Sequence, residues 1–223
     1  MLEIDRLSQY VAVAAGLGTA SYALVDGSKA ILGGVSNFGF KHIKRVVSGF
    51  FLKSDHSANP LHLKEVLATL RANWLNGIAL ADQKAIAKSL VKLRLNEENA
   101  KDLAKATGVD KDKLTSIAGK IASGDSLTPQ ENDAFGRFDL MLTAILDEGY
   151  QRADQSYRNS AKAWSIGVSV LIAVLAALTV NDPSFTVGKA ILVGLVATPI
   201  APIAKDLTSA LQAGVKVAQA FKK

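Results

Sequence analysis

Three long apolar stretches stand out in the hydropathy pattern of this chain, and a polar segment separates the first from the second. A helix that crosses the hydrocarbon core of a bilayer needs about 20 apolar residues. The stretch 163–181 contains no charged side chain, and Lys162 and Trp164 at its start are typical interfacial anchors. Asp182 and Pro183 end it. This stretch therefore predicts a transmembrane helix rather than the core helix of a soluble protein.

The third apolar stretch, residues 185–204, follows after a short turn and predicts a returning membrane helix. Its only charge is Lys189, which lies close enough to the end for its ammonium group to reach the interface. Pro199 and Pro202 each remove a backbone hydrogen-bond donor, so we expect a kink or a broken turn in the last third of this helix.

The first apolar stretch, residues 7–25, is uncharged but rich in small residues. Gly16 and Ala20 are one helical turn apart and would let helix backbones approach closely in lipid. Asp26 and Lys29 follow at a spacing that allows them to pair on one helix face. Either the span ends before this pair, or a longer helix carries the pair inside the membrane. These four residues are therefore candidates for helix packing or for lining a pore.

Basic residues flank the apolar stretches and predict the topology. The flanking cations are Lys41, Lys44 and Arg45 after the first stretch, and Arg152, Arg158 and Lys162 before the second. By the positive-inside rule, the central segment and the C-terminus are cytoplasmic, and the N-terminus and the hairpin turn lie outside. We expect Lys41, Lys44, Arg45 and Lys162 to contact lipid headgroups.

The central residues 61–162 show helical periodicity throughout, and none of them reads as strand. Gly77, Gly108 and Gly124 are expected helix ends. The segment 128–131 is a capping box with proline at the first helical position, and no helix breaker follows before the turn at residue 183. One long helix is therefore expected to leave this domain and continue into the second span.

The side chains expected to be buried recur at helical spacing. They are Ile86, Leu90 and Leu93 on one helix, Leu114, Ile117 and Ile121 on another, and Phe135, Phe138, Leu142 and Ile145 on the long helix. Residues 147–162 are polar on all sides, which predicts a solvated stalk or a surface for partners.

The predicted fold class is all-α, an integral membrane protein with three transmembrane helices and a helical cytoplasmic domain between the first and second. Residues 1–53 would form the first span and a basic juxtamembrane segment, and residues 54–162 the cytoplasmic domain and stalk. Residues 163–223 would form the membrane hairpin and an amphipathic C-terminal tail.

Composition excludes some chemistry. The chain has no cysteine, so disulfides, thiolate metal sites and cysteine nucleophiles are ruled out. Its net charge of +6 is compatible with nucleic acid or with an acidic membrane surface, and the position of the basic residues beside the apolar stretches favours lipid. The first six residues contain two acids and one base, unlike a signal peptide, so we expect the first stretch to stay in the mature protein.

No catalytic or ligand-binding motif emerges. Residues 103–117, with Gly108 in the turn, resemble a helix-turn-helix, but Asp110 and Asp112 at the start of its second helix would repel DNA phosphates. The histidines, His42, His56 and His62, lack partners at metal-ligand spacing. We therefore expect no enzyme activity, no cofactor, no metal and no nucleic acid, and membrane-tethered DNA binding is only a minor alternative.

The layout resembles a group of uncharacterised bacterial inner-membrane proteins with three spans. The shared elements would be Phe138-Asp139, Tyr157-Arg158, Asn181-Asp182 and Ala201-Pro202. The resemblance implies a multi-pass location in the inner membrane and no particular activity.

The leading functional hypothesis is a non-enzymatic membrane protein that assembles laterally, as a homo-oligomer or as an accessory or scaffold subunit of a larger membrane complex. The alternative is an oligomeric channel or pore lined by the first helix.

Overall fold

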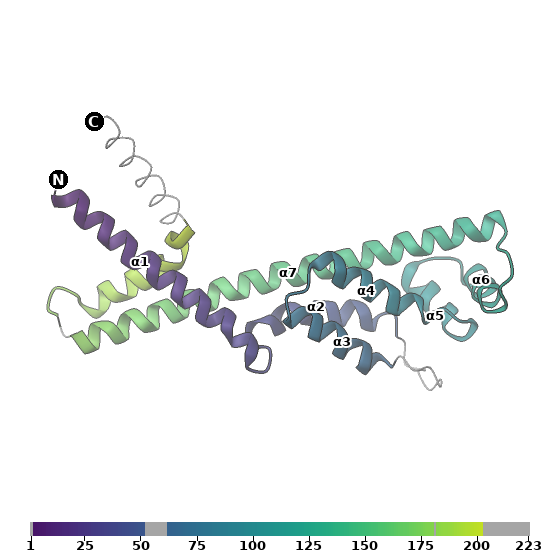
Figure 1. The fold of residues 1–223 in the computed structure, drawn as a ribbon, viewed down its shortest axis with the longest axis horizontal. Helices are drawn as coiled ribbons and strands as arrows, with labels where there is room; N and C mark the ends of the chain where they lie inside the picture. The colour runs from purple at the N-terminus through teal and green to yellow at the C-terminus, as the bar shows by residue number, and fades with distance from the viewer. Residues whose placement is uncertain (1, 52–61, 181, 203–223) are drawn as a thin grey trace, which may run out of the picture. The chain divides into compact units, whose positions relative to one another are not determined.

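The computed structural model describes residues 2–51, 62–180 and 182–202, and only the backbone of residues 2–8. Throughout these ranges the secondary structure is helical and contains no strand, which confirms the all-α class (Figure 1). The predicted C-terminal tail lies outside the described residues. The chain divides into two compact units. We call Met1–Val35 with Arg158–Lys223 the apolar unit and Ser36–Tyr157 the central unit.

The described residues form a succession of helices. They are α1 (Leu2–Gly27), the short 3-10 turns η1 (Ser28–Ala30) and η2 (Gly34–Ser36), α2 (Asn37–Ser48), α3 (Leu63–Leu75), α4 (Leu80–Lys92), α5 (Glu97–Thr107), α6 (Lys111–Ser123), α7 (Pro129–Val180) and a final helix, Val187–Pro202. The single helix α7 confirms the predicted continuous helix, and it supplies residues to both units.

Local signals in the sequence set the helix ends of the central unit. The side chain of Asn96 accepts a hydrogen bond from the backbone N–H of Asn99 at 2.8 Å and begins α5. Gly108 and Gly124, with φ of 69° and 79°, end α5 and α6 in the left-handed region that glycine adopts without strain. Asp110 caps α6 by accepting from the N–H of Asp112 and of Lys113. These boundaries agree with the predicted ones.

The core of the central unit forms where α2 to α6 pack against the first part of α7. The fully buried large side chains include Ile43, Leu70, Leu103, Leu114, Ile117, Phe138, Leu142, Leu146 and Tyr150. Each such aliphatic or phenylalanine side chain contributes about 1.5–3 kcal/mol through the apolar surface it removes from water.

Two predicted core positions are wrong, because α4 faces the core with other residues and the buried face of α6, which includes Leu114 and Ile117, does not extend to residue 121. Leu93 is 69% exposed and Ile121 is 48% exposed. The buried residues of α4 are Gln83, Ala87 and Val91. The small side chain at position 87 permits close helix packing, and the Gln83 amide donates to the Ile78 carbonyl at 2.6 Å, so burial of this polar group is partly compensated.

The segment 147–162 is not a stalk surrounded by solvent, because α2 covers one side of it. A Cβ on Gly39 of α2 would lie 2.7 Å from the Ala153 carbonyl oxygen, and a Cβ on Gly149 would lie 2.7 Å from the Val46 side chain. Tyr150 and Ala153 are accordingly buried. The apolar face of α2 thus packs into the central unit, and the two compact units divide at 35/36 and at 157/158.

The capping box at the start of α7 is present. Glu131 accepts hydrogen bonds from the Thr128 N–H at 2.7 Å and the Ser116 hydroxyl at 2.8 Å, and its carboxylate lies 2.7 Å from Lys120 Nζ. The Glu131 N–H is 3.3 Å from the Thr128 hydroxyl. The hydrogen bonds from Lys120, Thr128 and Ser116 lower the pKa of Glu131 from 4.5 to about 2.

This lowered pKa predicts an acid-sensitive contribution to stability. Because the pKa is lower in the folded state than in the unfolded state, the ionised carboxylate stabilises the fold fully above pH 4.5, and this stabilisation is lost as the pH falls toward 2. We expect Glu131→Gln to lower the free energy of unfolding at pH 7, with the difference from the wild type closing as the pH falls toward 2. Urea unfolding followed by circular dichroism measures this difference. Glu98→Gln, which removes an exposed charge, is the control, and a difference that does not change with pH would contradict the prediction.

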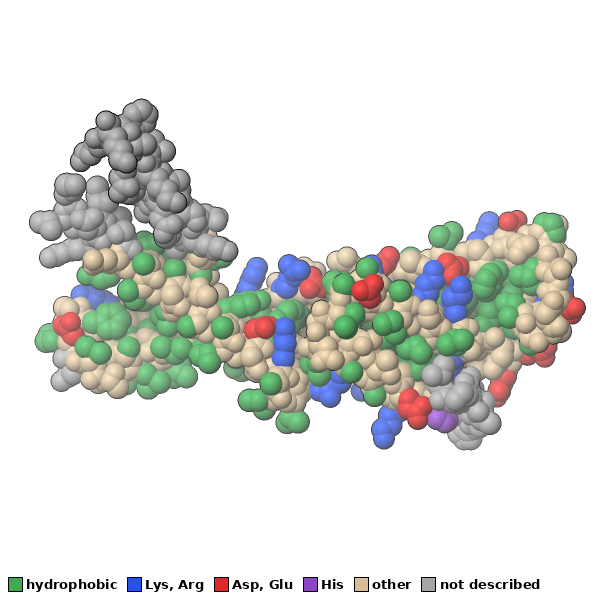
Figure 2. Space-filling view, in the orientation of Figure 1, with side chains coloured by type: hydrophobic (Ala, Val, Ile, Leu, Met, Phe, Trp, Pro, Cys, Tyr) green, Lys and Arg blue, Asp and Glu red, His purple; other side chains and the backbone are tan. Residues whose placement is uncertain are grey.

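The apolar unit consists of α1, the second part of α7 and the helix Val187–Pro202. Ala173, Ala177 and Ala190 form its small core, with Leu17 and Phe185 packed against them. Hydrophobic and uncharged surface covers most of this part of the chain in Figure 2, whereas Lys, Arg, Asp and Glu side chains gather over α2 to α6 and the adjacent part of α7.

One helix among the described residues, α7, is long and apolar enough to cross a membrane, and only 22% of its apolar window is buried. α1 has 26 residues but does not meet the same criterion for apolarity, and the apolar helix Val187–Pro202 is shorter than a span. The first and third predicted spans are therefore not confirmed by these helices.

Candidate functional site

The inward face of α1 consists of Ala14, Gly18, Ser21 and Val25. Their spacing of four, three and four residues places them on one side of the helix. A Cβ on Gly18 would lie 2.2 Å from the Ala197 carbonyl oxygen, which is closer than any side chain can approach. Gly18 therefore allows α1 to contact the backbone of the helix Val187–Pro202 directly.

A second close approach joins the two later helices of the apolar unit. A Cβ on Gly194 would lie 2.4 Å from the Cα of Val170 in α7. Nearby, the hydroxyl groups of Ser169 and Thr198 are 3.2 Å apart and share a hydrogen bond. Small residues and one interhelical hydrogen bond thus hold this unit together, as is common for helices that pack in lipid.

The predicted packing residues Gly16 and Ala20 do not take part in these contacts. Both are exposed, and a Cβ on Gly16 would meet no atom within 4 Å. At 100° per residue they lie on the side of α1 opposite Gly18. The sequence signal for Gly18 was the same small-residue run, but the run does not tell which of its glycines faces a neighbouring helix. A packing role for Gly16 and Ala20 toward another molecule stays a prediction.

Asp26 and Lys29 do pair, with 2.6 Å between Lys29 Nζ and Asp26 Oδ1. α1 ends at Gly27, so the pair stands at the end of the helix rather than inside a longer one. This placement agrees with the interpretation in which the first apolar helix ends near the pair. Leu32, Gly33 and Gly34 follow with positive φ, in the region that favours glycine.

Pro199 and Pro202 do not interrupt their helix, because the backbone stays helical from Val187 through Pro202. No broken turn therefore occurs up to the last described residue. Proline has no backbone N–H, so Pro199 cannot donate the usual helical hydrogen bond to the Leu195 carbonyl. The predicted kink stays a prediction.

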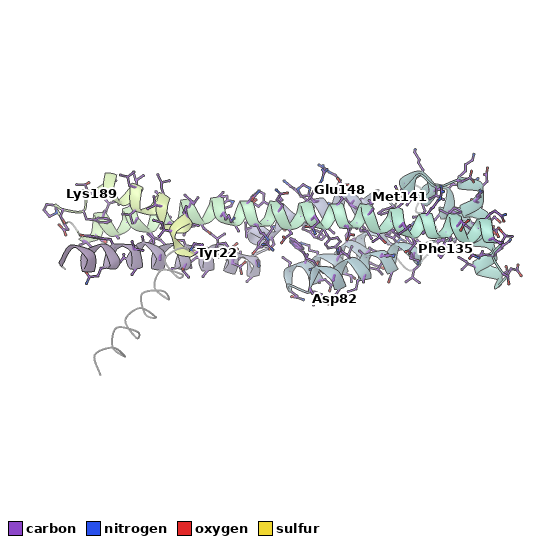
Figure 3. All side chains as sticks on the ribbon, turned by 90° about the horizontal axis from the view of Figure 1, so that it is seen from above. Tyr22, Asp82, Phe135, Met141, Glu148 and Lys189 are labelled. Carbon is purple, nitrogen blue, oxygen red and sulfur yellow. The ribbon has the colours of Figure 1, made fainter. Side chains whose placement is uncertain are left out.

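Polar and aromatic side chains mark the two ends of the apolar unit. Lys189 donates a hydrogen bond to the Ser184 carbonyl at 2.8 Å near the hairpin turn, and Tyr22 lies toward the other end (Figure 3). Trp164 is 58% exposed and follows the exposed Lys162 on α7. Lysine, tyrosine and tryptophan in such positions are typical of the membrane–water interface.

The cations of α2 form a second candidate site, in the central unit. Lys41, Lys44 and Arg45 are exposed, and the apolar face of α2 is buried beneath them. His42 is half-buried, and its pKa is lowered by burial and by the positive charges of Lys41, Arg45 and Arg152. In the sequence pattern, Arg152 indicates only the topology. Arg152 acts on His42 because α2 packs on α7.

The segment resembling a helix-turn-helix forms a hairpin of α5 and α6 that packs into the core. A groove of about 670 Å³ lies between its turn and α7. Its charged lining residues have both signs, namely Asp110, Lys113, Asp133 and Arg137. The Asp110 carboxylate caps α6 at the place where a DNA phosphate would have to approach.

Metal-ligating side chains do not gather in groups of three or more within the described ranges, and His56 lies outside them. Comparisons with protein-family models, with curated proteins and with solved structures found no match to this chain. The resemblance to three-span inner-membrane proteins therefore stays a prediction.

Proposed function

We propose that the chain is a membrane protein that assembles laterally, as a homo-oligomer or as an accessory subunit of a larger membrane complex. The observation that most supports a membrane location is the exposure of the apolar unit. Its outward side chains include Val13, Leu24, Leu171, Leu175, Leu178, Val180, Leu192, Leu195 and Val196, which are each between 44% and 68% exposed. An apolar surface of this extent is unfavourable in water and is solvated in a bilayer.

In this proposal, α1 and the helix Val187–Pro202 also lie in the membrane, packed on the second part of α7. The close contacts at Gly18 and Gly194 support this arrangement, because both helices share a small-residue interface typical of lipid-embedded bundles. The positive flanks at Lys41 and Lys162 support a cytoplasmic central unit in the inner membrane.

Lateral assembly is supported by the outer side of α1. Gly16 and Ala20 are small and exposed, and they make no close helix contact within the part of the chain that the structure describes. In lipid, small residues one turn apart let a further helix approach closely. The channel alternative lacks comparable support, because the Asp26–Lys29 pair stands at the end of α1, and we do not propose it.

The assembly state of the full-length chain in native membrane tests this proposal. We expect the chain to remain in the membrane fraction after alkaline extraction and to occur there as an oligomer or a complex. Replacing Gly16 and Ala20 together by leucine is expected to reduce the assembly to the monomer, because the bulkier side chains prevent close helix approach. Mass measurement in lipid nanodiscs extracted without detergent reports the change.

The matched control is the pair Ala176→Leu and Gly188→Leu, which enlarges exposed small residues on α7 and on the last helix. A wild-type chain that is strictly monomeric would refute lateral assembly. Release by alkaline extraction would refute the membrane location itself.

A further inference from the structure

The cationic surface of the central unit is built from two helices. We call Lys41, Lys44 and Arg45 of α2, with Arg152 of α7, the α2 cationic face. The three residues of α2 are three and four positions apart, which places them on one side of the helix. α2 contains no acidic residue.

Close packing fixes the direction in which this face points. Phe40, Ile43 and Val47 are buried in the core, so α2 cannot rotate without exposing them. Gly39 and Gly149 bring α2 and α7 so near that a Cβ at either position would clash. The side of α2 that carries these cations therefore points in a fixed direction.

Few acids balance these charges. Arg152 pairs with Glu148 at 2.5 Å, and both side chains are more than half exposed, so this pair is weak in water. Elsewhere in the described ranges, no acidic side chain forms an ion pair with Lys41, Lys44 or Arg45. Burial lowers the pKa of the neighbouring His42, and the positive charges of Lys41, Arg45 and Arg152 lower it further.

The position of the face along α7 favours a membrane over a soluble anion. The Ser156 hydroxyl donates to the Phe38 carbonyl at 2.9 Å, so the start of α2 lies beside residue 156. The uncharged stretch of α7 begins at Ala163, about two helical turns farther along the same helix. Phe38 is 41% exposed, and Lys41 Nζ lies 5.9 Å from the centre of its ring. An exposed aromatic ring beside a lysine is typical of membrane-interface segments.

We propose that the α2 cationic face binds the phosphate groups of anionic phospholipids in the leaflet that adjoins the central unit. This inference rests on the proposed membrane location. Attraction to an anionic leaflet decays over a Debye length of about 8 Å. Among the three cations of α2, Lys41 lies nearest to the start of the helix, which is the end beside residue 156. Lys41 therefore contributes more to lipid binding than Arg45. Each cation close to the headgroups increases affinity about fivefold.

Native mass spectrometry of the full-length chain in a non-ionic detergent tests this inference. The chain is titrated with phosphatidylglycerol, which is anionic, and with phosphatidylcholine, which is zwitterionic. We expect phosphatidylglycerol to bind at least tenfold more tightly. Exchanging Lys41, Lys44 and Arg45 together for glutamine is expected to remove this preference, and Lys41→Gln alone should weaken it more than Arg45→Gln alone.

The matched control replaces Lys101, Lys111 and Lys113 by glutamine, which removes the same charge from exposed positions on α5 and α6. Equal loss in this control would show a general charge effect and would overturn the inference. An unchanged preference in the α2 variant would also overturn it, as would duplex DNA that displaces the lipid at equal concentration. Alkaline extraction of the same proteins separates the two proposals, because a chain that stays in the membrane without a preference for anionic lipid contradicts only this inference.

Discussion

Replacing Gly18 by alanine is expected to destabilise the apolar unit by about 1–3 kcal/mol, the usual cost of an added methyl group in a tightly packed interior. The added Cβ would lie 2.2 Å from the Ala197 carbonyl oxygen and 2.9 Å from the Thr198 nitrogen. Both are backbone atoms, so the strain cannot be relieved by rotating a side chain, and α1 must move away from its neighbour. Thermal unfolding in lipid nanodiscs, followed by circular dichroism, measures the loss.

The chain offers a matched control two residues away. A Cβ on Gly16 meets no atom within 4 Å, so Gly16→Ala adds the same methyl group at no steric cost within the chain. Alanine favours a helix over glycine by up to about 1 kcal/mol, and this variant should be as stable as the wild type or more so. Equal stability of the two variants would show that α1 does not pack through Gly18.

Trp74→Ala is expected to destabilise the central unit by about 3–5 kcal/mol, the range for removing a large buried aromatic side chain. The Trp74 side chain lies against Gly39 and packs edge-on against the Tyr157 ring, with 6.1 Å between ring centres. Its indole Nε1–H donates to the Ser36 carbonyl at 3.0 Å. Truncation therefore leaves both a cavity and an unpaired carbonyl group.

The second tryptophan of the chain provides the control for this prediction. Trp164 is 58% exposed, so Trp164→Ala should leave the urea unfolding of the central unit unchanged. Circular dichroism at 222 nm is the appropriate signal, because each variant changes the intrinsic fluorescence. Trp74→Phe is expected to have an intermediate effect, since it keeps part of the aromatic packing but loses the volume of one ring and the hydrogen bond to Ser36. A Trp74→Ala variant as stable as Trp164→Ala would contradict the described core.

The boundaries of the central helices were predictable because each depends on local chemistry. Asn96 and Asp110 accept hydrogen bonds from backbone N–H groups that a helix start leaves unpaired, and Gly108 and Gly124 adopt the left-handed conformation that ends a helix. These interactions join residues within one turn of each other. They do not depend on how the rest of the chain packs.

The orientation of the helices was less predictable where apolar residues occur on more than one side. On α4, Ile86 and Leu90 are only partly buried, whereas Ala87 and Val91 face the core. Large side chains dominate a hydropathy pattern, but close packing of two helices can favour a small residue at the contact. In α2, the basic residues conceal the apolar face that docks on α7, so the sequence predicts only a basic juxtamembrane segment there.

The sequence by itself determined the all-helical class, the helix ends, the length of α7 and the apolar character of its second part, because propensity, capping and hydropathy act over a few neighbouring residues. Only the tertiary structure decided that Gly18 rather than Gly16 faces a neighbouring helix, and that α2 packs on α7 so that Arg152 acts on His42 together with Lys41 and Arg45. Both results depend on the rotation of one helix against another. That rotation is set by the fit of side chains that are distant in sequence, and a run of small residues or a cluster of cations does not specify it.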